Sequence, residues 1–231
     1  MSRSRYAIYF APAPTTPLWR LASAVIGRDA ATGETPPPPA AAPCDGPDWA
    51  ARTAEPRRYG FHATLKAPFE LAEGADEAML VAAAEAFAAA RTGFAVDDLA
   101  VDLLGDFVAL RPRVRNGDLD RLAADCVVAF EPFRAALDAR ERARRLGPDP
   151  NPARIEAVDR WGYAHVFEHF RFHMTLTGPL AAEEREPTRA ALARLLGEVV
   201  ARPMAVSAIA IFHQGDRAGP FHLLNRCPFG A

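Results

Sequence analysis

The sequence is poor in cysteine, lacks any long apolar run and carries no excess of positive charge. Its 3 cysteines, Cys44, Cys126 and Cys227, are scattered over 231 residues without a CxxC spacing. This pattern argues against a disulfide framework and against a cysteine-based zinc site. No segment approaches the roughly 18 apolar residues of a membrane span, and the N-terminal apolar run is too short for a secretory signal. We therefore expect a cytoplasmic protein without a membrane partner.

The charge balance restricts the possible partners. Lysine and arginine number 27 against 29 aspartate and glutamate, which gives a formal net charge of -2. No overall positive field exists to hold long nucleic acid, so an RNA partner would be a short end held by a local patch. Hydrophobic residues make up 50% of the chain, which is enough for a sizeable core.

The N-terminal part of the chain predicts a strand, a helix and a loop. Residues 6–10, YAIYF, are short, aromatic and β-prone. Thr16 and Pro17 suit the start of a helix that apolar residues at helical spacing continue to Gly27. The prolines in 31–48 exclude a helix or a central strand. This segment is expected to be a loop, and a flap is one hypothesis for its role.

One nine-residue stretch occurs twice. FHATLKAPF at 61–69 returns at 172–180 as FHMTLTGPL. Each copy is followed by a helix pattern, a strand pattern, a glycine-containing turn and a short strand, at an offset of 111 to 114 residues. The shared order indicates two similar halves. In each half the expected elements are a helix (75–90 and 188–200), a strand (94–104 and 204–212) and a short strand (107–110 and 221–224). Two further helices are expected between the halves, at 119–145, with an interruption at Pro132, and at 155–162.

Strand geometry gives the repeated motif a polar face. Residues two apart in a strand point to the same side, so His62 shares a face with Thr64, and His173 with Thr175. The intervening residues are apolar and are expected to pack into the core. By the same alternation, Lys66 is expected on the face of His62 and Thr64. If a pseudo-twofold axis relates the halves, the two polar pairs face each other across a cleft.

Two facing histidines suit phosphoryl chemistry. Imidazole titrates near neutral pH, so one ring can begin as a base and the other as an acid. On opposite sides of a phosphorus atom, they could activate water and protonate the leaving oxygen. The hydroxyls of Thr64 and Thr175 could donate to the non-bridging oxygens and stabilise their growing charge. This arrangement needs no metal and no other cofactor.

The two motifs resemble those of a known family. HATL at 62–65 and HMTL at 173–176, in a chain with duplicated strand-helix-strand halves, resemble the 2H phosphoesterase superfamily. That superfamily includes RNA 2′,3′-cyclic phosphodiesterases and the enzymes once called 2′-5′ RNA ligases. The neighbouring residues RYAIYFAP, RRYGFHATLKAPF and FRFHMTLTGPL are similar to the branch associated with phosphonate-degradation gene clusters. The resemblance covers most of the chain.

The resemblance implies a function and four site residues. It implies His62 and His173 as acid and base, in either assignment, and Thr64 and Thr175 as phosphate ligands. It implies hydrolysis of a small ribose cyclic phosphate, either a 2′,3′-cyclic nucleotide or phosphoribosyl 1,2-cyclic phosphate. Two alternatives stay open: a module that binds a nucleotide or RNA end without turnover, and an enzyme that ligates or cleaves RNA termini.

Three residues beside the motifs are further candidates for contact with substrate: Lys66, Tyr163 and Arg171. Lys66 is favoured over Arg58 and Tyr59 because it is expected on the polar face of the first motif. Packing would explain Tyr163 equally well, and simple exposure would explain Arg171.

Two other clusters have simpler interpretations than a site. His165, His169 and His173 recur every four residues, as in a helical zinc site, but the alternation in VFEHFRFHMTL favours a strand. We therefore expect no metal there. The arginines of 134–146 could steer a phosphate, yet alternating arginine and glutamate is more typical of a solvated helix face.

These patterns together predict an α+β protein. We expect two pseudo-twofold-related lobes, each an antiparallel sheet with helices on its outer face, enclosing a central cleft. The lobe with the first motif is expected at about 50–118 and the lobe with the second at about 160–231, within a single domain over 1–231.

Overall fold

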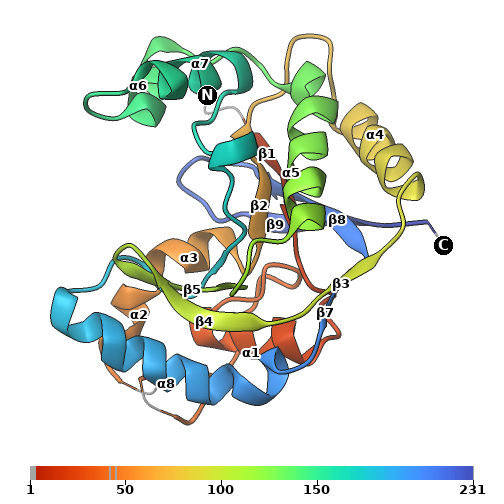
Figure 1. Ribbon diagram of the computed structural model, residues 1–231. Helices are drawn as coiled ribbons and strands as arrows, with labels where there is room; N and C mark the ends of the chain where they lie inside the picture. Colours follow the sequence, from red (N-terminus) through yellow and green to blue (C-terminus); the bar gives the residue numbers. More distant parts are fainter. Residues whose placement is uncertain (1–3, 42, 45, 231) are drawn as a thin grey trace.

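The fold is α+β, as the sequence predicts, with one large antiparallel sheet at its centre (Figure 1). The computed structural model describes residues 4–41, 43–44 and 46–230. Seven strands pair in the order β4-β5-β6-β2-β1-β8-β9, and β3 pairs with β7 in a small second sheet. The strands are β1 (Arg5–Phe10), β2 (Ala63–Phe69), β3 (Phe94–Val96), β4 (Leu99–Leu104), β5 (Phe107–Pro112), β6 (Met174–Thr175), β7 (Met204–Val206), β8 (Ala208–Gln214) and β9 (His222–Pro228).

Helices cover the sheet and fill the connections between strands. Figure 1 shows α6 and α7 at the end of the molecule opposite α8. Within the described residues, no helix combines the length and the apolar character needed to cross a bilayer. The helices are α1 (Pro17–Ile26), α2 (Trp49–Arg52), α3 (Ala54–Tyr59), α4 (Glu77–Ala89), α5 (Gly117–Ala129), α6 (Ala139–Leu146), α7 (Pro152–Trp161) and α8 (Ala182–Val200), with 3-10 turns η1 (Glu131–Phe133) and η2 (Phe167–His169).

The local signals at α1 and at the β4–β5 hairpin act as the sequence predicts. The Thr16 hydroxyl accepts a hydrogen bond from the N–H of Trp19, and Gly27 ends α1 with a φ of 79°. Gly105 and Asp106 join β4 to β5 in a two-residue turn, where Gly105 has a φ of 67°.

The two halves of the chain exchange their hairpins. Strand β6, which carries the second motif, pairs with β5 of the first half, whereas β8 and β9 of the second half join β2 through β1. Helix α4 packs on β8 and β9, and α8 packs on β4 and β5. The sequence-based lobes cover about 50–118 and 160–231. In the structure, each half of the sheet contains strands from both ranges: β6 joins β4 and β5 on one half, and β2 joins β8 and β9, through β1, on the other.

The apolar face of each motif lies in the main core. Ala63, Leu65, Met174 and Leu176 are each at most 2% exposed, and they pack with buried side chains of α4, α5 and α8. Burial of apolar surface stabilises a fold by about 25 cal/mol per Å2. The core therefore holds both motif strands in position and leaves their opposite face for polar groups.

Two helices differ from the expected boundaries. The predicted helix at 119–145 ends at Ala129, is followed by η1 with Pro132, and resumes as α6, as a proline interruption requires. Helix α8 begins at Ala182, before the expected 188, and contains Pro187. The loss of one backbone hydrogen bond at Pro187 does not end this helix, because its inner face is fully buried at Leu192 and Leu196.

Three strands also differ from the expectation, and one of them, predicted at 204–212, is divided into β7 and β8 at Ser207. The predicted strand at 94–104 is divided into β3 and β4 at Asp98, which has a φ of 55°. The second motif contributes only Met174 and Thr175 to the ladder. Burial nevertheless alternates from 170 to 176, which is the side-chain pattern that the sequence predicts for a strand.

The proline-rich segment forms no helix or strand in its described part, which is 31–41, 43–44 and 46–48. None of these described residues lines either cavity of the candidate site. Residues 42 and 45 of the predicted loop lie outside the described part of the chain. Its role as a flap stays a prediction.

Candidate active site

The two motifs lie side by side on neighbouring strands. Ala63 of β2 pairs with Met174 of β6 in an antiparallel ladder. This register sets His62 opposite Thr175 and Thr64 opposite His173, and directly opposite residues have Cβ atoms about 4.5–5.5 Å apart. The two polar pairs therefore occupy one surface of one sheet, related by a local twofold axis.

Both histidines are anchored in the same way. His62 Nδ1 lies 2.9 Å from the carbonyl oxygen of Gly60, and His173 Nδ1 lies 2.7 Å from that of Arg171. A carbonyl oxygen only accepts, so Nδ1 of each neutral ring carries the proton and donates. Nε2 is thereby left with a lone pair in both rings. Thr64 Oγ1 lies 3.3 Å from His62 Nε2 and can donate to it.

A glycine and a tyrosine position the first imidazole. Gly60 ends α3 with a φ of 78°, and a Cβ at this residue would lie 2.5 Å from the Cβ of Ala30. This turn directs the Gly60 carbonyl to His62. Tyr9 stacks on the His62 ring with 3.7 Å between ring centroids. Sequence reasoning missed Tyr9, because only the pairing of β1 with β2 brings it to the motif.

Burial lowers the pKa of both histidines. The pKa of His62 falls from 6.5 to about 4, mainly through burial; the Gly60 carbonyl opposes this shift and the nearby His173 adds to it. Burial also lowers the pKa of His173, against the opposing effect of the Arg171 carbonyl. Both rings are therefore largely neutral at pH 7 when no ligand is bound.

We expect the protein to lose stability in mild acid through His62. Its pKa is about 4 in the folded protein against 6.5 for an unperturbed histidine, so its contribution is complete above pH 6.5 and is lost as the pH falls toward 4. The loss reaches up to about 3 kcal/mol at pH 4. Urea unfolding of the wild type and of His62→Asn from pH 7 to pH 4 measures this, and the variant should lose less. Equal losses in the two proteins would contradict the expectation.

The polar face of the motifs opens into two adjoining cavities. The first has a volume of about 390 Å3 and is lined by His62, Thr64 and Thr175. The second has a volume of about 480 Å3 and is lined by His173 and again by Thr64. Tyr163 also lines both cavities. All four motif side chains therefore reach one continuous site.

Lys66 does not join this site. Its side chain is 3% exposed, and its Nζ donates to the carbonyl oxygen of Val127 at 3.0 Å and to Glu131 Oε2 at 2.7 Å. It lines neither cavity. Lys66 therefore attaches α5 and η1 to the sheet and makes no contact with a ligand at the motifs.

A bulge explains why the alternation fails at this residue. The pairing of β1 with β2 steps from Tyr9–Thr64 to Ile8–Lys66, so β2 has one residue more than β1 at this point. An extra residue reverses which side chains point to each face of the sheet. Strict alternation therefore does not extend past Leu65, and the placement of Lys66 beside His62 and Thr64 is corrected.

Tyr163 and Arg171 both reach the site. Tyr163 is half-buried and burial raises the pKa of its hydroxyl. Arg171 is exposed and lines only the second cavity, while its backbone carbonyl anchors His173. Tyr59, the weaker candidate from the sequence, lines the first cavity with its ring 6.2 Å from that of His62. Each can contact a ligand that occupies the two adjoining cavities.

The three histidines at four-residue spacing do not share a helix. His169 ends η2, and His165 lies in the irregular segment between α7 and that turn. Among the residues that the structure describes, no group of three or more His, Cys, Asp or Glu side chains is arranged to hold a metal ion. His165 lines both cavities next to Tyr163, with 5.4 Å between ring centroids.

The structure adds four arginines to the site. Arg5 of β1, Arg144 and Arg145 of α6, and Arg154 of α7 all line the first cavity. The alternating charges of 134–146 favoured a solvated face, and this interpretation is wrong for the C-terminal end of α6. The signal that could have shown this is the pair of adjacent arginines at the end of the run. Adjacent residues of a helix point in different directions, so both cannot face the solvent equally, and the side chain of Arg145 is 9% exposed.

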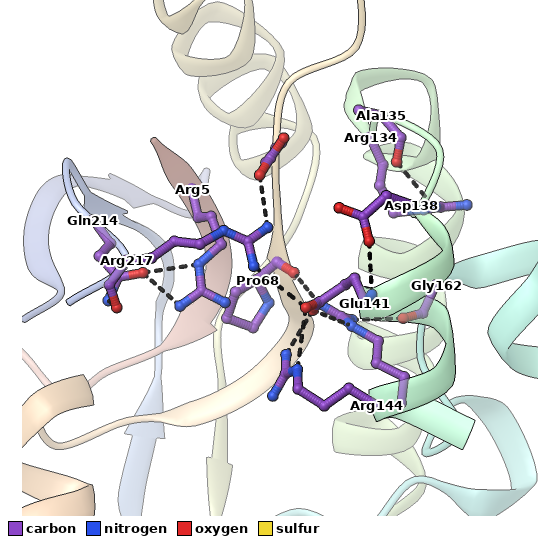
Figure 2. A network of polar contacts seen from close by, with 12 residues as sticks. Arg5, Pro68, Arg134, Ala135, Asp138, Glu141, Arg144, Gly162, Gln214 and Arg217 are labelled. Carbon is purple, nitrogen blue, oxygen red and sulfur yellow. Dashed lines mark hydrogen bonds and ion pairs between the residues drawn. The ribbon is translucent and has the colours of Figure 1, made fainter. Parts of the chain in front are cut away.

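Glu141 holds two of these arginines, Arg144 and Arg145, in place (Figure 2). Its carboxylate accepts hydrogen bonds from Arg144 at 2.6 Å, from Arg145 at 2.9 Å and from Arg217 at 3.3 Å. Burial by itself would raise the pKa of Glu141, but the hydrogen bonds from Arg144 and Arg145 outweigh it and lower the pKa to about 2. The carboxylate is therefore ionised at any physiological pH.

The fold and the site together define the class of protein. Two His-x-Thr motifs on paired strands of an antiparallel sheet, with matched imidazole anchors, form the arrangement that the 2H phosphoesterase resemblance implies. A family model described as "Protein of unknown function (DUF1045)" matches residues 64–222. The chain belongs to this family.

Two curated relatives are similar to almost the whole chain. One is the ribose 1,5-bisphosphate phosphokinase PhnN of Janthinobacterium sp. (strain Marseille), 37% identical over 99% of this chain and 51% of the relative. The other is the ribose 1,5-bisphosphate phosphokinase PhnN of Laribacter hongkongensis (strain HLHK9), 35% identical over 95% of this chain and 50% of the relative. The chain thus spans about half the length of the curated relatives that it matches.

Solved structures of E. coli LigT align with this fold at low identity. The complex with phosphate is 13% identical, covers 100% of both chains and has a TM-score of 0.43. The complex with 3′-AMP is 14% identical, covers 99% of both chains and has a TM-score of 0.45.

Proposed function

We propose that this protein hydrolyses a cyclic phosphodiester of a small ribose derivative, with His62 and His173 as the acid-base pair. The observation that carries the proposal is the matched anchoring of the two rings. Each Nδ1 donates to the carbonyl of the residue two positions earlier, so two equivalent Nε2 atoms are held over one site. A histidine with a purely structural role would not require a second histidine, related by symmetry and held in the same tautomer, beside it.

The reaction follows from the positions of these groups. One Nε2 accepts a proton from water while the water oxygen forms a bond to phosphorus. The bond from phosphorus to one ring oxygen of the ester breaks, and the other histidine donates a proton to that oxygen. The product is a phosphate monoester with a free hydroxyl, and the two histidines have exchanged their protonation states. Each proton transfer of this kind contributes about 10²–10⁴-fold in rate.

We assign His62 as the base. With a pKa of about 4, its ring is neutral and able to accept a proton at neutral pH. His173 then starts as the acid, since the negative charge of a bound phosphodiester raises the pKa of an adjacent imidazole. The hydroxyls of Thr64 and Thr175 lie opposite His173 and His62 in the register, where they can donate to the non-bridging oxygens. No step of this scheme requires a metal.

The name of the relatives supports a ribose phosphate as the substrate. They are named for ribose 1,5-bisphosphate. Opening the ring of a 5-phosphorylated ribose 1,2-cyclic phosphate at the bond to O2 would produce that compound. Phosphoribosyl 1,2-cyclic phosphate is therefore our first candidate, and a 2′,3′-cyclic nucleotide, which has the same five-membered ring, is the second.

The kinase activity in that name has no support among the residues of this chain. A phosphate-binding loop of P-loop kinases requires the pattern GxxxxGK[ST]. The chain has a single lysine, Lys66, which lies inside a strand and is paired with Glu131. The part of the relatives that this chain does not match is the more suitable place for a kinase site.

A hydrolysis panel in the presence of EDTA tests the proposal. The substrates are phosphoribosyl 1,2-cyclic phosphate, the four 2′,3′-cyclic nucleotides and an oligoribonucleotide that ends in a cyclic phosphate. We expect turnover of a small ribose cyclic phosphate, with phosphorus NMR identifying which ester bond is broken. Binding without turnover on every substrate would favour a binding module, and a strong preference for the oligoribonucleotide would favour action on RNA ends.

A further inference from the structure

The first cavity is strongly asymmetric in charge. The motif groups that line it are His62, Thr64 and Thr175, and it is also lined by four arginines and a single exposed glutamate, Glu55. The chain as a whole has a net charge of -2, so this concentration of positive charge is local. The twofold relation of the motifs does not account for it. The arginines come from β1 and from the α6–α7 segment, which connects the two halves of the chain.

Arg5 is a buried cation without a carboxylate partner among the described residues. Its side chain is 6% exposed, and its Nε and Nη2 donate to the same neutral oxygen, Gln214 Oε1, at 2.8 and 2.5 Å (Figure 2). Burial lowers the pKa of Arg5; the charge of Arg217 acts in the same direction, whereas Tyr59 and the more distant carboxylate of Glu141 oppose the shift. Burying a charge is costly unless a counter-charge accompanies it. An anion in the cavity would supply one.

Arg154 offers a donor that no described residue uses. Its Nη2 donates to the carbonyl oxygen of Arg145 at 3.1 Å, while its Nε is buried and has no hydrogen-bond partner in the described structure. The buried Nε is closed to a ligand as well as to water. Arg154 lines the first cavity, and its Nη1 makes no hydrogen bond with a described residue, so Nη1 is the donor that a ligand there could use.

The other two arginines of the cavity have different roles. All three donor groups of Arg145 are occupied, by Glu141, by the carbonyl of Gly162 and by the carbonyl of Pro68. Arg145 therefore serves the structure. Arg144 uses its Nε and Nη2 on Glu141, and its side chain is 62% exposed. Glu141 is shared by Arg144, Arg145 and Arg217, and Arg217 is also paired with Glu70. Two carboxylates thus face these three arginines, so positive charge remains in excess.

We propose that Arg5, Arg144 and Arg154 form a subsite for a terminal phosphate monoester of the substrate. The inference rests on the proposed function and names the substrate class: a cyclic phosphate that carries a second phosphate on the same sugar. Arg5 lies four residues before Tyr9 on β1, about 13 Å along the strand from the residue that stacks on His62. An arginine side chain covers several ångström of this interval, and one pentose spans the remainder.

A matched pair of substrates tests the subsite. Ribose 1,2-cyclic phosphate and its 5-phosphorylated form differ only in the group assigned to the arginines. We expect kcat/KM to be at least about 10-fold higher for the 5-phosphorylated form, because hydrogen bonds to charged groups contribute about 1.5–3 kcal/mol. Arg154→Gln should lower kcat/KM by about 10-fold or more for the 5-phosphorylated substrate and by less than about 2-fold for the other.

Arg142→Gln is the matched control. Arg142 is on α6, is bonded to Asp159 and does not line the cavity, so this variant should act like the wild type on both substrates. Equal turnover of the two substrates by the wild type, or an equal loss on both in Arg154→Gln, would refute the subsite while leaving the hydrolase intact. If neither substrate is hydrolysed, the proposed function fails, and calorimetric titration with ribose 5-phosphate then decides the subsite. Binding that Arg154→Gln weakens supports it, and no binding to the wild type overturns it.

Discussion

His62→Asn and His173→Asn are each expected to lower kcat/KM for the cyclic phosphate by at least about 10²-fold. Asparagine keeps a donor near the position of Nδ1, so the bonds to the Gly60 and Arg171 carbonyls can persist. It has no counterpart of Nε2, which is the atom that we propose to transfer the proton. The loss therefore reports catalysis and not the anchoring of the strand. Initial rates over a range of substrate concentration at pH 7 measure it.

The double variant and a surface histidine complete this test. Because the two rings act in one step, His62→Asn combined with His173→Asn should lose little more than the worse single variant. His222→Asn is the control, since His222 contacts Arg28 and lines neither cavity. We expect it to retain the wild-type rate. Full activity in either motif variant would refute the two-histidine mechanism, whatever the substrate.

Glu141→Gln is expected to destabilise the protein by about 3–5 kcal/mol. Glu141 is 7% exposed and is the carboxylate that Arg144, Arg145 and Arg217 share. Glutamine keeps the shape but removes the charge, so the almost completely buried Arg145 loses its counter-charge. Removing one partner of a buried ion pair is far more costly than removing the pair, because the remaining charge stays out of water. Urea unfolding at pH 7 measures the change.

Asp159→Asn provides the comparison for Glu141→Gln. Asp159 pairs with Arg142 between α7 and α6, and both side chains are 44% exposed. An exposed pair of this kind contributes little to stability, so Asp159→Asn should unfold at nearly the same urea concentration as the wild type. The folded-state pKa of Glu141 is depressed to about 2, so its stabilising effect is complete above pH 4.5 and disappears as the pH falls through 2. The difference between wild type and Glu141→Gln should therefore shrink in acid, and a loss below about 1 kcal/mol at pH 7 would contradict this role.

Local sequence signals determined much of the fold. The cap at Thr16, the turn at Gly105, the proline interruption at 132 and the order of elements after each motif depend on neighbours in the chain. The choice of His62, Thr64, His173 and Thr175 also follows from the sequence, because alternation in a strand is a local property. These residues were predicted as the site, and the structure brings all four to one depression.

Long-range pairing determined what surrounds those four residues. The register of β2 against β6 sets the two motifs side by side, and the hairpins cross between the halves, which no local pattern specifies. The bulge that turns Lys66 away from the site exists only because β1 pairs with β2. The exposed side chains on α6 and α7 follow the charge pattern, but whether an arginine at a helix end meets water or a cavity depends on what packs beside it.

The sequence by itself therefore determined which groups we propose to react, since a duplicated His-x-Thr motif places an imidazole and a hydroxyl on one face wherever the strand lies. Only the tertiary structure decided the environment of those groups: the stack of Tyr9 on His62, the lowered histidine pKa values, and the arginines of β1, α6 and α7 at the same cavity. The physical reason is range. Backbone alternation acts over two residues, whereas burial and charge come from separate segments of the chain, such as β1, α6 and α7, that meet the motifs only when the core has formed.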